Sequence, residues 1–167
     1  EPECIKKYYE GCATLADMAR KAASMEGVDF LSFRMEGGDP NGANKSTEEL
    51  IGELKEIADA VDLPLVVCGC KNVEKDAELF SKAAEALNGK NAVILSAKEE
   101  NYKTVGAAAG LAYKQIVGAE SAVDINLAKQ LNVLISQLGV DSKSVVMNVG
   151  SAAVGYGFEY VISTMDR

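Results

Sequence analysis

The chain has 167 residues, of which 48% are hydrophobic and 25% charged, as is usual for a single globular domain. Its net charge of −8 argues against binding to nucleic acid, which needs clustered lysine and arginine. The sequence also has no run of lysine and arginine of the kind that binds a membrane surface. No apolar run approaches the ~18 residues of a membrane-spanning helix, and no signal peptide is recognisable. The first residue is glutamate instead of methionine, so we expect a processed or excised piece of a longer protein.

Two residue types limit the chemistry that the chain can perform. It contains no histidine, which removes Ser-His and Cys-His nucleophiles, histidine metal sites and the commonest general base. Its four cysteines, Cys4, Cys12, Cys68 and Cys70, have neither zinc nor iron–sulfur spacing. A chain that has few cysteines and is long enough to form a large core does not need disulfides for stability. We therefore expect reduced thiols and a cytoplasmic protein. Carboxylates, amides, Lys, Tyr, Ser or a bound cofactor must therefore supply any chemistry.

The sequence predicts helices and strands that alternate along the chain. Apolar residues at a spacing of three to four predict helices over about 3–25, 47–61, 73–87, 101–113, 124–138 and from 157 onwards. Ser46 and Glu49 fit a capping box before the second of these helices, and Asp124 fits an N-cap. Apolar or alternating runs predict strands at about 28–35, 64–70, 92–97, 116–119 and 144–150.

This alternation predicts an α/β fold with a parallel sheet, because right-handed crossovers lay each helix on the sheet. About five βα units in a single domain over 1–167 fit part of a (β/α)8 TIM barrel or, alternatively, a flavodoxin-like open parallel sheet. In the first strand, Ser32, Arg34 and Glu36 alternate with apolar residues, and such a half-polar face suits a barrel interior. A full barrel needs about 250 residues, so we expect an incomplete TIM barrel.

Both architectures place the binding site at the carboxyl ends of the strands. The segments after the predicted strands are rich in amides and small residues, which suits hydrogen bonding to a large polar ligand better than unaided catalysis. We therefore predict no catalytic residue and no metal ligand. The predicted cofactor-binding residues are Arg34, Glu36, Asp39, Asn41, Asn44, Cys70, Ser96, Asn101, Asn148 and Gly150.

Several of these residues also have a purely structural interpretation. Arg34 and Glu36 would satisfy each other as a salt bridge. Asp39 and Asn44 would form turns in the Gly-rich loop. Asn101 would be a helix N-cap. Cysteines at 68 and 70 would be small buried thiols without special reactivity.

Four segments carry a resemblance to a known family: GGDPNGANKS (37–46), EENYK (99–103), DINLAKQLN (124–132) and GYGFEY (155–160). In order and approximate spacing they resemble the small, or delta, subunit of the corrinoid iron–sulfur protein in the acetyl-CoA decarbonylase/synthase system. The resemblance covers roughly residues 12–167. It implies a (β/α)8 barrel related to pterin-binding methyltransferases, paired with a large, gamma, subunit that carries an iron–sulfur cluster and a cobamide domain.

The resemblance also implies a role for the chain. The cobamide would lie between the two subunits, over the barrel mouth, and relay a methyl group from methyl-pterin to acetyl-CoA synthase in the reductive acetyl-CoA pathway. The chain lacks the histidine of the cobalt-ligating Asp-x-His-x-x-Gly signature and any cysteine set for a cluster, as expected if the partner chain holds both metals. The expected partners are the gamma subunit, a methyl-pterin methyltransferase and acetyl-CoA synthase.

Two other functions stay open beside this non-catalytic one. A pterin-dependent methyltransferase on the same barrel would need Asp39, Asn101 and Asn148 to hold the pterin ring. A flavodoxin-like domain would bind a phosphorylated ligand at GSAAVGYG (150–157), which resembles a phosphate-binding turn before a helix. That turn has neither the P-loop lysine nor a GxGxxG pattern.

Overall fold

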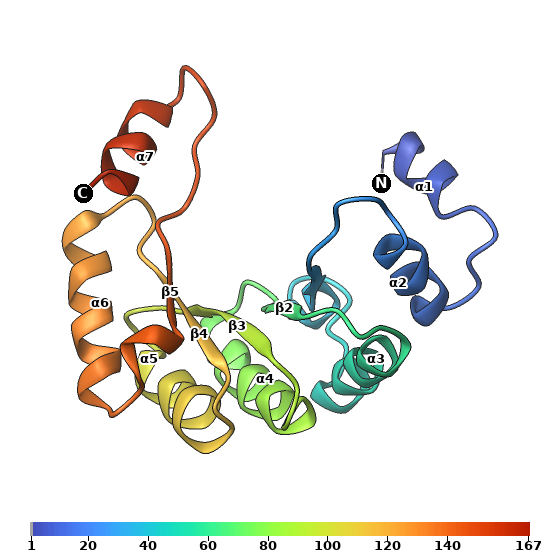
Figure 1. The fold of residues 1–167 in the computed structure, drawn as a ribbon, viewed down its shortest axis with the longest axis horizontal. Coiled ribbons are helices and arrows are strands. Elements are labelled where there is room, and N and C mark those ends of the chain that lie inside the picture. The colour runs from blue at the N-terminus through green and yellow to red at the C-terminus, as the bar shows by residue number, and fades with distance from the viewer. Residues whose placement is uncertain (1) are drawn as a thin grey trace.

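A five-stranded parallel sheet forms the centre of the molecule (Figure 1). The computed structural model describes residues 2–167. The strands are β1 (Leu31–Arg34), β2 (Leu65–Cys68), β3 (Ala92–Ala97), β4 (Ile116–Glu120) and β5 (Val145–Asn148). They lie side by side in the order of the sequence, β1-β2-β3-β4-β5. The α/β class and the parallel sheet predicted from the sequence are thus confirmed.

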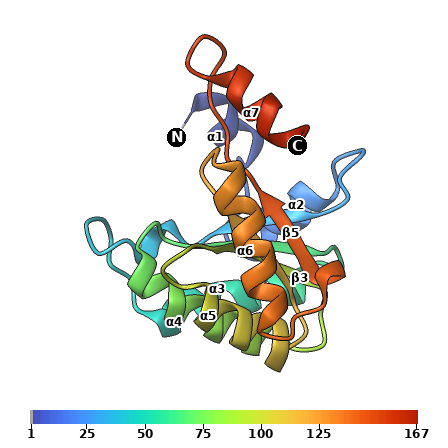
Figure 2. The ribbon, with the colours of Figure 1, turned by 90° about the vertical axis from the view of Figure 1, so that its left-hand side faces the viewer.

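The strand order distinguishes this sheet from a flavodoxin-like one. The sheet is open, as that alternative expected, but a flavodoxin-like sheet has the order 2-1-3-4-5, because its chain reverses direction after the second strand. Here each crossover advances by one strand in the same direction. The helices α3 (Thr47–Ala60), α4 (Val73–Ala86), α5 (Tyr102–Val105) and α6 (Ile125–Gln137) consequently lie around the outside of the sheet (Figures 1 and 2).

The core lies between these helices and one face of the sheet. The alternate strand residues Leu65, Val67, Ile94 and Val117 are buried on that face. Helix α4 presents Leu79, Phe80, Ala83 and Ala84 to it, and Leu87, the residue directly after the helix, is buried beside them. Apolar burial of this kind contributes about 25 cal/mol per Å² and stabilises the layer. Among residues 2–167, no helix covers the opposite face of the sheet (Figures 1 and 2), and polar side chains lie where its strands end.

A β-bulge interrupts the pairing of β3 with β4. Leu95 pairs with Gly118, but the next pair is Ala97 with Ala119, so Ser96 is an extra residue. Because Ala97 and Ala119 both remain buried against the helices, the bulge turns Ser96 toward the uncovered face, beside Leu95. A Cβ at Gly118 would lie 2.4 Å from Leu95 Cδ1, so a larger residue at this point of β4 would displace the Leu95 side chain.

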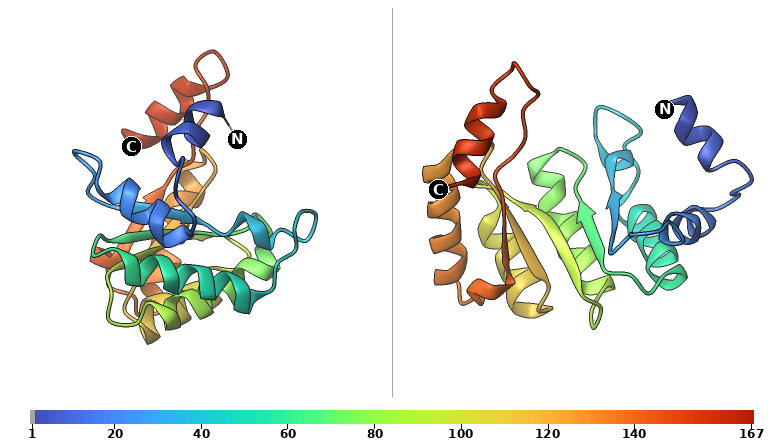
Figure 3. Two further views of the ribbon diagram at one scale, coloured as in Figure 1. Left: turned by 90° about the vertical axis from the view of Figure 1, so that its right-hand side faces the viewer. Right: turned by 45° about the horizontal axis from the view of Figure 1, so that its top comes forward.

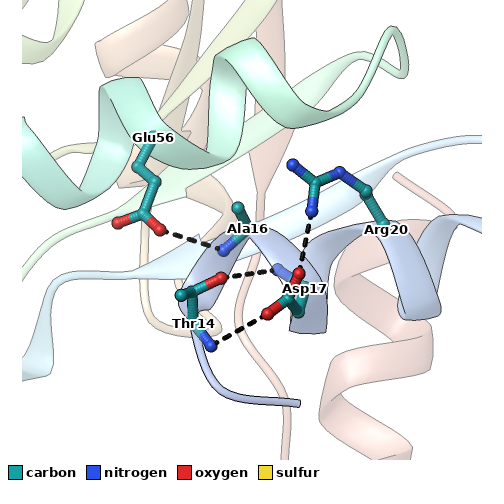
Figure 4. A network of polar contacts seen from close by, with 5 residues as sticks. All are labelled: Thr14, Ala16, Asp17, Arg20 and Glu56. Atoms are coloured by element: carbon teal, nitrogen blue, oxygen red, sulfur yellow. Dashed lines mark hydrogen bonds and ion pairs between the residues drawn. The ribbon is translucent and has the colours of Figure 1, made fainter.

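The helix predicted over residues 3–25 is in fact two helices, α1 (Glu3–Tyr8) and α2 (Leu15–Ala23). The chain breaks between these helices because a new helix start is encoded locally, although the apolar spacing alone predicts one continuous helix. Thr14 and Asp17 form a capping box that begins α2, and Asp17 also forms an ion pair with Arg20 at 2.9 Å (Figure 4). Ala16 N donates to Glu56 of α3 at 3.5 Å, which ties α2 to its neighbour (Figure 4).

The Ala-rich helix predicted over 101–113 is also divided. It begins as α5 and continues as a π-helical segment over Gly106–Ala112. A Cβ at Gly110 would lie 2.6 Å from Val140, so the small residues allow close packing against the turn after α6. The other helices agree with prediction to within a few residues, and the Ser46–Glu49 capping box and the Asp124 N-cap are both confirmed.

The chain ends in α7 (Phe158–Met165), which lies near the amino end of α6 on the side of the sheet where the strands end (Figures 1 and 3). Within residues 2–167, none of the helices has the length and apolar character needed to cross a membrane.

Candidate functional site at the strand ends

Polar side chains from all five strands or the loops after them line one cavity of about 240 Å³. Because the strands are parallel, their carboxyl ends meet at the same edge of the sheet. We call this space the strand-end cavity. Its lining residues are Arg34, Glu36, Cys68, Gly69, Lys71, Asp76, Leu95, Ser96, Lys98, Glu120 and Asn148.

Ion pairs order one side of the strand-end cavity. Glu36 Oε1 lies 3.2 Å from Arg34 Nη1 and 3.0 Å from Lys71 Nζ, so this carboxylate bridges the ends of β1 and β2. The hydrogen bond and charge of Lys71, with a smaller effect of Arg34, hold the pKa of Glu36 below its ordinary value. These side chains are half-exposed or more, which limits the contribution of the pairs to stability.

Lys71 adopts a left-handed backbone conformation with φ of 71°, which is unfavourable for a residue with a Cβ. Strained backbone of this kind is concentrated at functional sites. The conformation brings the Lys71 ammonium group over Glu36 at the cavity rim.

The opposite side of the cavity comes from β3, β4 and β5. Lys98 Nζ lies 3.4 Å from Glu120 Oε1, with both side chains about one-third exposed. Asn148 Nδ2 donates to Ser96 Oγ at 3.4 Å, across the intervening strand β4. Asn148 Oδ1 accepts from Gly150 N at 3.1 Å, which fixes the orientation of the amide.

A buried carboxylate closes the floor between β2 and α4. Asp76 is 6% exposed, and its Oδ1 accepts from Cys70 N at 2.6 Å. A Cβ at residue 69 would overlap this carboxylate, so Gly69 is required for Asp76 to border the cavity. The thiol of Cys70 lies behind it, and burial first, then contact with Asp76, raise its pKa above the ordinary value.

The structure brings four of the ten predicted binding residues to the strand-end cavity: Arg34, Glu36, Ser96 and Asn148. The Arg34–Glu36 salt bridge, raised as a structural alternative, is present in the cavity wall. The remaining six residues have other surroundings.

Three predicted residues lie in the Gly-rich loop after β1, outside the cavity lining. Asp39 Oδ1 accepts from Asn41 N at 2.9 Å and thus forms a turn. Asn44, with φ of 47°, accepts from Lys75 Nζ at 3.1 Å, and Lys75 also donates to the carbonyl of Lys45 at 2.8 Å. Lys75 therefore fastens the loop to α4.

Cys70, Asn101 and Gly150 are adjacent to the site without lining the strand-end cavity. Cys70 is fully buried in the core, whereas Cys68 borders the cavity, so the two thiols have different environments. Asn101 makes no cap bond to α5; instead its Oδ1 accepts from Lys98 N at 2.8 Å. Asp39, Asn101 and Asn148, which a pterin site would need together, do not share this cavity.

Four charged residues of the lining, Lys71, Asp76, Lys98 and Glu120, are not among the ten predicted binding residues. Lys71 follows the strand predicted at 64–70 and Glu120 the strand predicted at 116–119, so the strand-end rule points to both of them. Asp76 lies within the first turns of α4. The only sequence signal that places it close to the cavity is the glycine at 69, which leaves room for its carboxylate. Among residues 2–167, no group of three or more cysteine, aspartate or glutamate residues is arranged to hold a metal ion.

Comparison with known proteins gives one family. The family model for the CO dehydrogenase/acetyl-CoA synthase delta subunit matches residues 1–167. Subunit delta of the acetyl-CoA decarbonylase/synthase complex from Methanopyrus kandleri is 35% identical over 152 residues, which is 90% of this chain and 38% of the relative.

Two further relatives carry the same description. The subunit from Methanothermobacter thermautotrophicus is 34% identical over 90% of this chain and 39% of its own length. The subunit from Archaeoglobus fulgidus is 30% identical over 99% of this chain and 37% of its own length. The chain thus spans about two fifths of the length of the curated relatives it matches.

Proposed function

Because the chain belongs to the CO dehydrogenase/acetyl-CoA synthase delta subunit family, we propose that it holds one side of a cobamide in an acetyl-CoA decarbonylase/synthase complex. The other side belongs to a large, gamma, corrinoid iron–sulfur subunit. The observation that carries the proposal is the strand-end cavity, in which an amide, a hydroxyl and paired charges from five strands converge. In this role the chain is a binding component and performs no catalytic step by itself.

The residues of the cavity fit the periphery of such a cofactor. Corrinoids carry neutral primary amides, which both donate and accept hydrogen bonds. The cavity contains three cationic and three acidic side chains, so its formal charge is balanced, and Ser96 and Asn148 can donate and accept. A volume of about 240 Å³ accommodates amide side chains but not a macrocycle, which would remain outside, over the rim.

Each part of the cavity has a separate role in this proposal. Asn148, held by Gly150 N, and Ser96 orient an amide of the ligand. The Lys98–Glu120 and Lys71–Glu36 pairs supply donors and acceptors without adding net charge. When bound, the cobamide supplies the metal-centred chemistry of methyl transfer, and methyl-pterin methyltransferase and acetyl-CoA synthase are the proposed donor and acceptor partners.

We also propose that the sheet is part of a (β/α)8 barrel. The sequential strand order and the placement of the helices on one face are those of such a barrel. On the opposite face Val66, Val93 and Leu95 are only partly buried, and Val146 is 45% exposed. These apolar residues would be covered by the remaining strands of a longer protein. The four free cysteines favour the reducing cytoplasm as its compartment.

The test is to co-produce the full-length protein with the large corrinoid iron–sulfur subunit and to measure corrinoid absorbance in the purified complex. We expect the complex to retain cobamide through gel filtration, and the large subunit alone to lose it. Equal retention by the large subunit with and without this protein would contradict the proposal. Calorimetry with a methyl-pterin in the absence of any corrinoid protein tests the methyltransferase alternative, which predicts tight binding.

A further inference from the structure

Asp76 differs from the other charged side chains of the strand-end cavity in its burial. Arg34, Glu36, Lys71, Lys98 and Glu120 have side chains that are 30–70% exposed, and each belongs to an ion pair. Asp76 is 6% exposed, and within residues 2–167 no lysine or arginine forms an ion pair with it. A buried carboxylate without a cation is costly unless hydrogen-bond donors replace the lost water.

The surroundings of Asp76 leave it directed toward the cavity. One oxygen, Oδ1, accepts from Cys70 N at 2.6 Å, which holds the side chain against the turn after β2. The backbone of Gly69 lies against the carboxylate, and any Cβ there would displace it. The absence of a side chain at 69 is thus the opening through which Asp76 borders the cavity.

We propose that the Asp76 carboxylate accepts a hydrogen bond from the N–H group of a neutral primary amide of the ligand, and so makes the cavity select amides over the corresponding carboxylic acids. An ionised carboxylate only accepts, so it binds an amide N–H and repels a second carboxylate. Ser96 and Asn148 carry donors for the amide oxygen. Because the three cationic and three acidic side chains of the cavity already balance, an added cation would leave the site with an uncompensated charge. This inference rests on the cobamide-binding function proposed above.

The test compares two corrinoids that differ in these groups: cobinamide, whose peripheral amides are intact, and cobyrinic acid, in which they are carboxylic acids. Affinities are measured by absorbance titration of the full-length protein assembled with its large subunit. We expect wild-type protein to favour cobinamide, and Asp76→Asn to lower that preference about tenfold, because its new N–H₂ group donates to a carboxylate. Asp141→Asn is the matched control, since Asp141 also accepts a backbone N–H, from Lys143, but lies outside the cavity.

The outcomes separate this inference from the proposed function. A preference that is the same in wild type and Asp76→Asn overturns the role of Asp76, while cobamide binding itself stands. Failure of the wild-type complex to bind either corrinoid overturns both. Folding is checked by circular dichroism, and if Asp76→Asn does not fold, Asp76→Ser replaces it because serine retains an oxygen for Cys70 N. Equal affinity of wild-type protein for the two corrinoids overturns the inference without any variant.

Discussion

Asn148 Nδ2 reaches Ser96 Oγ at 3.4 Å although β4 lies between their strands. Next-but-one strands of a sheet are separated by roughly 9–10 Å, so this contact needs converging side chains and space over the middle strand. Gly118 leaves β4 without a side chain beside Leu95, and the bulge at Ser96 turns its hydroxyl toward the uncovered face. The strand-end cavity therefore depends on backbone features as much as on its polar residues.

Lys71 is predicted to lower the stability of the fold while it contributes to cobamide binding. Replacing it with glycine relieves the left-handed strain and should raise the free energy of unfolding by about 0.5–1 kcal/mol, since its exposed ion pair with Glu36 contributes little. The same variant should bind cobamide more weakly. Lys114→Gly is a matched control, because Lys114 has φ of 56° and lies outside the cavity. Urea denaturation should show that it is equally stabilised, and titration should show unchanged affinity.

Gln115 is predicted to be a structural residue at the opposite end of the sheet. It is 2% exposed, its Oε1 accepts from Ala92 N at 2.9 Å, and its Nε2 donates to Leu87 O at 2.8 Å. Gln115→Leu would leave both backbone groups buried without partners and should lower the free energy of unfolding by about 2–4 kcal/mol. Gln130→Leu, at an exposed position of α6, should change it little. Comparable losses in the two variants would refute this assignment.

The thiols are predicted to react unequally with iodoacetamide. Cys4 is exposed and should be alkylated first, whereas Cys70 is fully buried and its raised pKa keeps the thiol protonated at neutral pH. Mass spectrometry of the folded protein should therefore find residue 70 unmodified, and denatured protein should be modified at all four cysteines. Rapid labelling of Cys70 in the folded protein would show that the turn after β2 opens readily.

The capping box of α3 is predicted to make stability depend on pH. Hydrogen bonds from the backbone N–H and then the side chain of Ser46 lower the pKa of Glu49 in the folded protein. A depressed pKa stabilises the fold above the unfolded-state pKa, and this stabilisation is lost as the pH falls through the lower, folded value. The difference in unfolding free energy between wild type and Glu49→Gln should thus be largest near neutral pH and shrink in acid. In a Ser46→Ala background the difference should be smaller at every pH.

Much of the fold followed from local patterns. Apolar periodicity located the strands, and the Ser46–Glu49 and Asp124 caps were visible because capping needs only neighbouring residues. The division of the first helix was missed because the apolar spacing continues across a break that the Thr14–Asp17 capping box produces. The π-helical segment after α5 was missed as well, since the close packing of Gly110 on Val140 is a tertiary effect.

The candidate site was less predictable than the fold. The rule that binding residues follow parallel strands selected Arg34, Glu36, Ser96 and Asn148 correctly as neighbours in space. It also selected Asp39 and Asn44, whose side chains instead bond within their own loop and to Lys75. Asp76 lies on a helix, and its approach to the cavity depends on the gap at Gly69, which a strand-end rule does not detect.

The affinity of the assembled complex for cobamide, measured with the Asn148→Ala variant, tests the proposed function most directly. Asn148 orders the far side of the strand-end cavity through Ser96 and Gly150, so its loss should weaken cobamide binding about tenfold. Asn88→Ala, at an exposed position away from the cavity, should bind as wild type does. A correctly folded Asn148→Ala complex with wild-type affinity for cobamide would contradict the proposal that the strand-end cavity holds the cofactor.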